Sequence, residues 1–116
     1  MKKFKDPNKV ANNIGLKDEK GNIIVQPDYF QIGDFKDGFA LVVKGYNLYI
    51  KPTYYYGAID AEGNIVVDIS FDMENEKSRL YVLDQIDKIK NHELNKNISK
   101  KKIYRIKVSN KKINSI

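Results

Sequence analysis

The sequence predicts a mainly β fold with a small α element. Two repeated β-hairpin units are expected to form a twisted antiparallel sheet, followed by a short helix and a C-terminal edge strand. The main evidence is that residues 18–25, DEKGNIIV, recur at residues 60–67 as DAEGNIVV, an offset of 42 residues. Recurrence at a fixed spacing is typical of one supersecondary unit used twice. In the last third of the chain, apolar residues share a helical face over 84–94 and alternate with cationic residues over 103–108. These two patterns predict the helix and the edge strand.

Each copy of the repeat carries turn chemistry between β-forming residues. The carboxylates of Asp18 and Asp60 are suited to accept a backbone N–H two residues on, which favours a turn. Gly21 and Gly63 then suit a left-handed residue that closes the turn. Both copies are therefore predicted β-hairpins, with strand residues at 14–16 and 23–25 in the first copy and at 56–59 and 65–67 in the second.

The first unit continues beyond its hairpin. Pro27 is predicted to end the second strand, because proline cannot donate to a strand ladder. Asp37 and Gly38 form a second turn signal. The apolar run 39–43 after it predicts a short strand.

Taken together, these motifs make the chain resemble the bacterial WG-repeat family over about residues 14–83. The resemblance implies a β-rich array with a role in protein interaction and no established catalytic residues. The Trp that names the family is missing, and Ile14 and Tyr56 stand in its place. The second copy fades after its hairpin, where only Leu80 and Val82 are placed like Ala40 and Val42. The residues that carry the resemblance are Gly15, Asp18, Gly21, Pro27, Tyr29, Asp34, Phe35, Gly38, Ala40 and Val42, followed by Gly57, Asp60 and Gly63.

The last third predicts one helix and one strand. Asp84 is a suitable N-cap for a helix over 84–94, in which apolar residues share a face. Residues 79–83 fit either the last strand of the second unit or the first turn of the helix, and we favour the strand. Alternation of apolar and cationic residues over 103–108 predicts an edge strand.

The length and composition predict a single domain over residues 1–116. It comprises a first β-repeat at 14–56, a degenerate second repeat at 57–83, and a helix, basic arm and capping strand at 84–116. Cysteine is absent, and the longest apolar run, 39–43, is too short for a signal peptide or a membrane span. We therefore expect a cytoplasmic protein without a membrane partner. A capped monomer is favoured over a homodimer.

The positive charge lies at the C-terminal end. Residues 1–72 hold nine lysines and ten acids, a net charge of −1, whereas residues 73–116 hold twelve cations and five acids, a net charge of +7. This basic arm is consistent with non-specific nucleic-acid binding, although the general excess of lysine, asparagine and isoleucine explains it nearly as well. The candidate nucleic-acid-binding residues are Lys100, Lys101, Lys102, Tyr104, Arg105, Lys107, Lys111 and Lys112.

No catalytic apparatus is visible in the sequence. The aspartates of the two turns are explained by turn chemistry, and His92, the only histidine, has no cysteine with which to share a metal. The serines have no Gly-x-Ser-x-Gly context, and the glycines form no phosphate-binding pattern. We expect a non-enzyme without a metal or cofactor.

Aromatic residues concentrate in one segment. Nine of the thirteen lie between Tyr29 and Tyr56. Tyrosine is enriched at interface centres because it combines a large rigid surface with a polar tip. The alternative is that these phenols fill the core in place of the missing Trp. The candidate protein-binding residues are Tyr46, Leu48, Tyr49, Ile50, Tyr54 and Tyr55.

Two functions follow. The first is a non-enzymatic protein-binding module. By analogy with other small chains, it would be an inhibitor or immunity-type protein from a phage or mobile element, anti-CRISPR-like, that blocks a larger host machine. The alternative is a nucleic-acid-binding protein that acts through the basic arm. A combined interpretation, in which the partner is a nucleoprotein complex, is left open.

Overall fold

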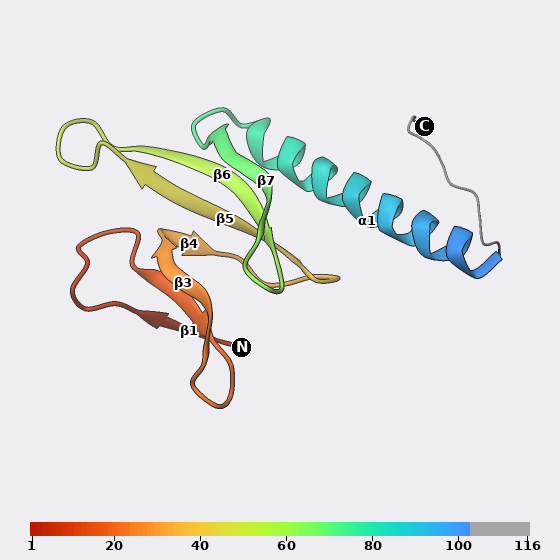
Figure 1. The fold of residues 1–116 in the computed structure, drawn as a ribbon. Coiled ribbons are helices and arrows are strands. Elements are labelled where there is room, and N and C mark those ends of the chain that lie inside the picture. The colour runs from red at the N-terminus through yellow and green to blue at the C-terminus, as the bar shows by residue number, and fades with distance from the viewer. Residues whose placement is uncertain (103–116) are drawn as a thin grey trace. The chain divides into compact units, whose positions relative to one another are not determined.

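The computed structural model describes the backbone of residues 1–102 and the side chains of residues 1–92. Residues 1–86 form one compact unit, which we call the body, and residues 87–116 are a second unit. Figure 1 shows the order of the elements along the chain. Their bounds are β1 Lys2–Lys5, β2 Ile14–Lys17, β3 Ile23–Tyr29, β4 Gln31–Ile32, β5 Phe39–Tyr46, β6 Thr53–Asp60, β7 Ile65–Asp72 and α1 Ser78–Lys102.

The strands form two antiparallel sheets. One has the order β1-β2-β3 and contains the first hairpin, and the other has the order β4-β5-β6-β7 and contains the second. The chain passes from the first sheet to the second at Phe30, whose backbone N–H donates to the carbonyl of Val43 (2.8 Å). The predicted mainly β, antiparallel fold class is confirmed, but the two hairpins lie in separate sheets. The strands β1 and β4 were not expected from the sequence.

The two hairpins are equivalent down to their strand register. In both, the pairing shifts at two places, by two residues after Ile14 and Tyr56 and by one residue after Leu16 and Ala58, so that each hairpin carries a bulge in its second strand. Every pair in the first hairpin has a counterpart 42 residues later. The matching pairs are Ile14↔Tyr29 with Tyr56↔Phe71, Leu16↔Val25 with Ala58↔Val67, and Lys17↔Ile23 with Ile59↔Ile65.

The bulge explains the glycine at the start of each copy. A Cβ on Gly57 would lie 2.7 Å from the Cα of Ile69, and one on Gly15 would lie 2.8 Å from the nitrogen of Pro27. Such contacts are too close, so only glycine fits opposite the bulge. The prediction that Pro27 ends its strand was wrong. Because β3 is an edge strand and Pro27 sits in its bulge, the strand tolerates the missing N–H and continues to Tyr29.

The two predicted hairpin turns have the same hydrogen bonds. In the first, Asp18 Oδ1 accepts the backbone N–H groups of Lys20 and Asn22, each at 2.9 Å. Asp60 accepts the corresponding N–H groups in the second turn at the same distances. Gly21 and Gly63 both have a φ of 88°, the left-handed region that favours glycine. The turn interpretation of these aspartates is confirmed.

The second turn packs on the first hairpin. A Cβ on Gly63 would lie 2.9 Å from the carbonyl oxygen of Ile24 and 3.4 Å from a methyl group of Val25, whereas one on Gly21 would meet nothing within 4 Å. Figure 1 shows the β6–β7 turn beside β3. The turn of the second repeat thus packs against β3 of the first repeat. The buried core cluster spans both hairpins: Leu16, Val25, Tyr29, Ile32, Ala40, Val42 and Ile59.

The helix begins six residues earlier than predicted and continues past residue 94. The favoured strand over residues 79–83 was wrong, and Leu80 and Val82 are not strand counterparts of Ala40 and Val42. Val82 and Ile86 lie four residues apart and both are buried, so they share one helical face. Asn75 accepts the N–H of Lys77 just before the helix (3.0 Å). The predicted edge strand at 103–108 lies outside the described residues.

Candidate functional site

The β5–β6 hairpin ends in an exposed aromatic and aliphatic loop. Its tip, residues 47–52, stands at one end of the body (Figure 1). Tyr49 is 90% exposed and Ile50 is 91% exposed, whereas Tyr46 at the base is 45% exposed. We call the six predicted residues of this hairpin, together with Phe30, the tyrosine surface. Large apolar side chains this exposed contribute nothing to the core.

The base of the loop is packed. A Cβ on Gly45 would lie 2.8 Å from Leu48 Cδ2 and 2.9 Å from Tyr54 Cε1, so both side chains lie over this glycine. The Tyr54 ring also contacts Phe30, with ring centroids 4.6 Å apart. On the other face of the strand, Tyr46 and Tyr55 meet edge to face at 5.5 Å. Pairs of this geometry stabilise beyond their buried area.

Backbone hydrogen bonds hold the loop itself. Asn47 has a φ of 52°, and its carbonyl accepts the N–H groups of Ile50 (3.2 Å) and Lys51 (3.1 Å). The Thr53 hydroxyl donates to the carbonyl of Tyr46 at 3.4 Å. The tip is therefore a closed turn that presents Tyr49 and Ile50 outward.

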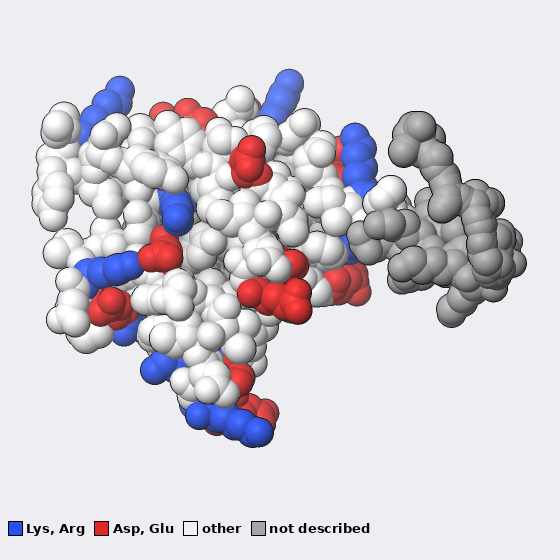
Figure 2. Space-filling view, in the orientation of Figure 1, with Lys and Arg blue, Asp and Glu red and all other residues white. Residues whose placement is uncertain are grey.

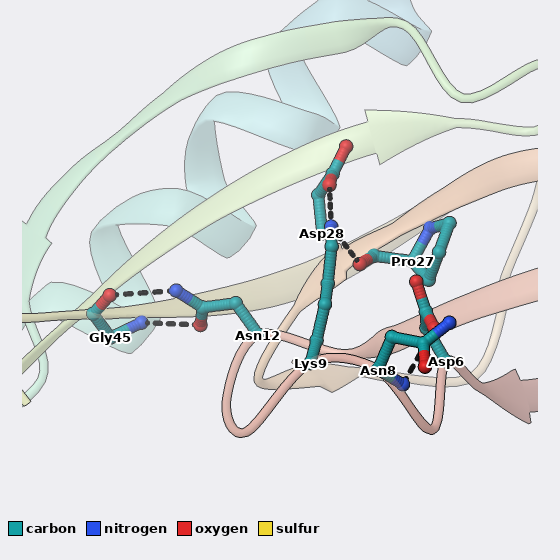
Figure 3. Close-up of polar contacts among 7 residues, drawn as sticks. All are labelled: Asp6, Asn8, Lys9, Asn12, Pro27, Asp28 and Gly45. Atoms are coloured by element: carbon teal, nitrogen blue, oxygen red, sulfur yellow. Dashed lines mark hydrogen bonds and ion pairs between the residues drawn. The ribbon is translucent and has the colours of Figure 1, made fainter.

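Asn12 fixes the end of β5 (Figure 3). Its amide Nδ2 donates to the carbonyl of Gly45 at 2.8 Å, and its Oδ1 accepts the N–H of Gly45 at 2.9 Å. The carbonyls of Leu41 and Val43 accept on the same edge of β5, from Gly33 and Phe30. The side chain of Asn12 thus acts like one more peptide unit beside β4.

The loop that carries Asn12 is anchored to the bulge of β3. Lys9 Nζ donates to the carbonyl of Pro27 at 2.8 Å and forms an ion pair with Asp28 at 2.7 Å (Figure 3). Asp6 accepts the N–H of Asn8 at 2.9 Å. The loop therefore has fixed contacts at both ends, and Val10 between them is 86% exposed.

The charged residues within the segment that forms the β5–β6 loop and its flanks are lysines, although Asp72 of β7 pairs with Tyr55 across the sheet. Between Asp37 and Asp60 the sequence has two lysines, Lys44 and Lys51, and no acid. Lys44 Nζ lies 5.2 Å from the centroid of the Tyr29 ring. Burial raises the pKa of the Tyr29 hydroxyl, and nearby Asp28 and Tyr46 raise it further. At the end of the body where Figure 1 places the β5–β6 loop, Figure 2 shows mostly uncharged side chains.

The six predicted protein-binding residues lie on one hairpin but on two faces of it: Leu48 and Tyr54 cover Gly45 on one face, and Tyr46 and Tyr55 meet on the other. Tyr54, Tyr55 and Leu48 are half-buried and support the more exposed members. Sequence reasoning missed Asn12, Lys9 and Phe30. Asn12 and Gly45 are 33 residues apart and no local motif marks their contact.

The alternative nucleic-acid site cannot be built from the described side chains. The backbone of Lys100, Lys101 and Lys102 belongs to α1. The other five candidates, Tyr104, Arg105, Lys107, Lys111 and Lys112, lie outside the described residues.

The described residues contain neither a cluster of metal-binding side chains nor a helix suited to cross a membrane. No group of three or more His, Cys, Asp or Glu side chains in that part of the chain is placed to hold a metal ion. Nor does α1 there combine the length and apolarity that a membrane crossing requires.

Comparison with known proteins gives one match. Residues 14–49 match the family model described as WG containing repeat, which covers the first hairpin, β4, β5 and the first half of the β5–β6 loop. No curated protein and no solved structure matches the chain.

Proposed function

We propose that the chain is a non-enzymatic protein-binding module, on the premise that residues 14–49 match the family model of WG containing repeats. The tyrosine surface is its contact surface. The observation that carries this proposal is the exposure of Tyr49 and Ile50 at the tip of a loop whose base is held by Asn12 and by the Phe30–Tyr54 contact. A rigid support lowers the entropy lost when the exposed side chains are immobilised by a partner.

The charges indicate the kind of partner. Lys44 and Lys51 flank the apolar tip, and no acid lies between Asp37 and Asp60. Complementary charges across an interface accelerate encounter and exclude wrong partners. The partner surface that fits is an apolar depression with an acidic rim on another protein.

The test is an affinity capture from the native cell, in which mass spectrometry identifies the captured proteins. The parent chain is compared with variants in which tyrosines of the tyrosine surface are replaced. The double variant Tyr46→Ala, Tyr49→Ala should lose the captured protein, while its melting temperature should fall only by the small amount that the lost Tyr46–Tyr55 ring contact contributes. Tyr81→Ala is the matched control, because Tyr81 is 49% exposed in α1. It should retain the partner.

Charge reversal supplies a second test. Lys51→Glu should weaken capture, and its effect should shrink at high salt because exposed charges are screened. Equal capture by the parent and the double tyrosine variant would contradict the proposal. A large drop in the melting temperature of Tyr49→Ala would instead assign that ring to the core. Measured turnover by the purified chain would contradict the non-enzymatic part.

We further propose that the chain inhibits the protein it binds. This proposal rests on the small size of the chain. Its test follows from the capture experiment. The activity of the captured partner should fall when the parent chain is added and should be unchanged by the Tyr46→Ala, Tyr49→Ala variant.

A further inference from the structure

A hollow of about 340 Å³ lies in the body, outside the loop of the tyrosine surface. Both sheets and the first turn of α1 contribute to its lining. Its volume lies at the lower end of the range for small-molecule sites. The apolar part of the lining is formed by Ile14, Ile32, Leu41 and Val43.

The two repeats meet at this hollow. Ile14 and Tyr56 both line it, and they occupy equivalent positions in the two hairpins, 42 residues apart. Each precedes the glycine that faces a bulge. Ile14 is the smaller of these two equivalent side chains.

The polar side chains that line the hollow are cationic or neutral, and each of them can donate a hydrogen bond. Lys3 and Arg79 contribute positive charge, and the amide of Gln31 and the hydroxyl of Tyr56 are further donors. No acidic residue lines it. Within the part of the chain that the structure describes, neither Lys3 nor Arg79 takes part in the ion pairs that join Lys9 to Asp28 and Lys90 to Asp87.

The start of α1 adds to the positive potential. Arg79 is the second residue of the helix, and the first turn contains no acid. The unsatisfied N–H groups at a helix N-terminus carry partial positive charge. The charge of Arg79 is therefore not offset within its own turn.

From these features we propose that the hollow binds a small organic carboxylate with an apolar body. The planar guanidinium of Arg79 matches a carboxylate with two parallel hydrogen bonds. Lys3 supplies a second charge, and the aliphatic lining accommodates the hydrocarbon part of the ligand. This site is independent of the proposed protein-binding function.

The probe is 3-phenylpropionate, titrated into the full chain by calorimetry and followed by NMR. We expect saturable binding, with shifts at Ile14, Ile32 and Tyr56. The alcohol 3-phenylpropanol has the same apolar body without the charge and should bind much more weakly. Inorganic phosphate has charge without the apolar body and should not displace the probe at equal concentration.

Variants locate the site. Arg79→Gln should lower the affinity about tenfold or more, because a charge-assisted hydrogen bond is lost, and Lys3→Gln should lower it by a smaller factor. Lys20→Gln removes an exposed lysine of the first turn and should leave affinity unchanged. Ile14→Trp should fill the hollow and abolish binding. The melting temperature of each variant is measured alongside.

Several results would overturn the proposal. These are the absence of saturation with the parent chain, equal affinity for the alcohol, displacement by phosphate, and full affinity in Arg79→Gln. Because Arg79 is exposed, its substitution leaves the fold intact. The proposal therefore stays testable even if Ile14→Trp does not fold.

Discussion

The carbonyl oxygen of Ile24 lies so close to Gly63 that a Cβ added there would be 2.9 Å from it. The turn of the second repeat is thus seated on the backbone of the first. The equivalent turn at Gly21 has no such neighbour. This pair of turns, alike in conformation and different in surroundings, allows a matched measurement of how much the contact between repeats contributes.

Gly63→Ala should destabilise the body more than Gly21→Ala does. Both substitutions place a Cβ at a φ of 88°, which costs about 1–2 kcal/mol. Only the first also pushes against Ile24, which should cost about 1 kcal/mol more. Urea unfolding of both variants measures the difference. Equal losses would mean that the second turn is not seated on β3.

Gly57→Ala should destabilise by about 2 kcal/mol or more, because its Cβ would overlap the bulge backbone at Ile69. Gly15→Ala should behave alike, since its Cβ would meet the bulge at Pro27. Gly33→Ala is the control, because its nearest contact of 3.2 Å is less severe. Thermal unfolding ranks the three, and a mild Gly57→Ala would argue against a bulge at this position.

Asn12→Gly should destabilise by about 1–3 kcal/mol, since two hydrogen bonds to Gly45 are lost. Glycine accepts the φ of 49° at this position, so the loss reports the hydrogen bonds and not strain. Amide hydrogen exchange at Gly45 should accelerate in the variant. Asn13→Gly, which removes only an exposed contact to Lys9, should leave that exchange rate unchanged.

Stability should fall as the pH drops below about 4. Hydrogen bonds from Asn22, Lys20 and Gly21 lower the pKa of Asp18 from its ordinary value of 3.8. At Asp60, partial burial raises the pKa, but hydrogen bonds from Asn64 and its neighbours outweigh it and the net shift is also downward.

A lowered pKa in the folded state stabilises the fold above the unfolded pKa, and this contribution is lost as the pH falls through the folded value. Denaturant unfolding between pH 2 and pH 6 should therefore show a weaker acid dependence in Asp60→Asn than in the parent. An unchanged slope in this window would contradict the pKa shift at Asp60.

The nucleic-acid alternative predicts a salt dependence. If the basic arm binds phosphates, replacing Lys100, Lys101 and Lys102 by glutamine should reduce the slope of log K against log salt by about 0.7–0.9 per lost contact. Replacing Lys2, Lys3 and Lys5 of β1 removes the same charge elsewhere and is the control. Flat salt dependence in the parent would rule out the arm as a nucleic-acid site.

The sequence predicted the elements that depend on local chemistry. The turns at Asp18, Asp60 and Asp37–Gly38 follow from hydrogen bonds and left-handed residues within a few positions of each other. The offset of 42 residues correctly indicated equivalent hairpins. The glycines before them remained unexplained, because the bulge they face is formed by another strand.

The features that the sequence did not predict are non-local. The division into two sheets depends on the crossing at Phe30, and the support of the tyrosine loop depends on Asn12, which has no motif of its own. The start of α1 was misjudged because residues 79–83 also fit a strand. The burial of Val82 and Ile86 on one helical face decides in favour of the helix.

The side chain of Asn12 has a consequence for how copies of this chain can associate. It takes up both the donor and the acceptor that Gly45 would otherwise offer along the open margin of β5. A strand from another molecule would have to displace the Asn12 amide before it could pair with β5 at Gly45, beyond the end of β4. Polymerisation by sheet extension is therefore obstructed beside the loop in which Tyr49 and Ile50 are most exposed. Other copies of the chain can contact these apolar side chains, but they do not find unpaired backbone groups of Gly45 next to them.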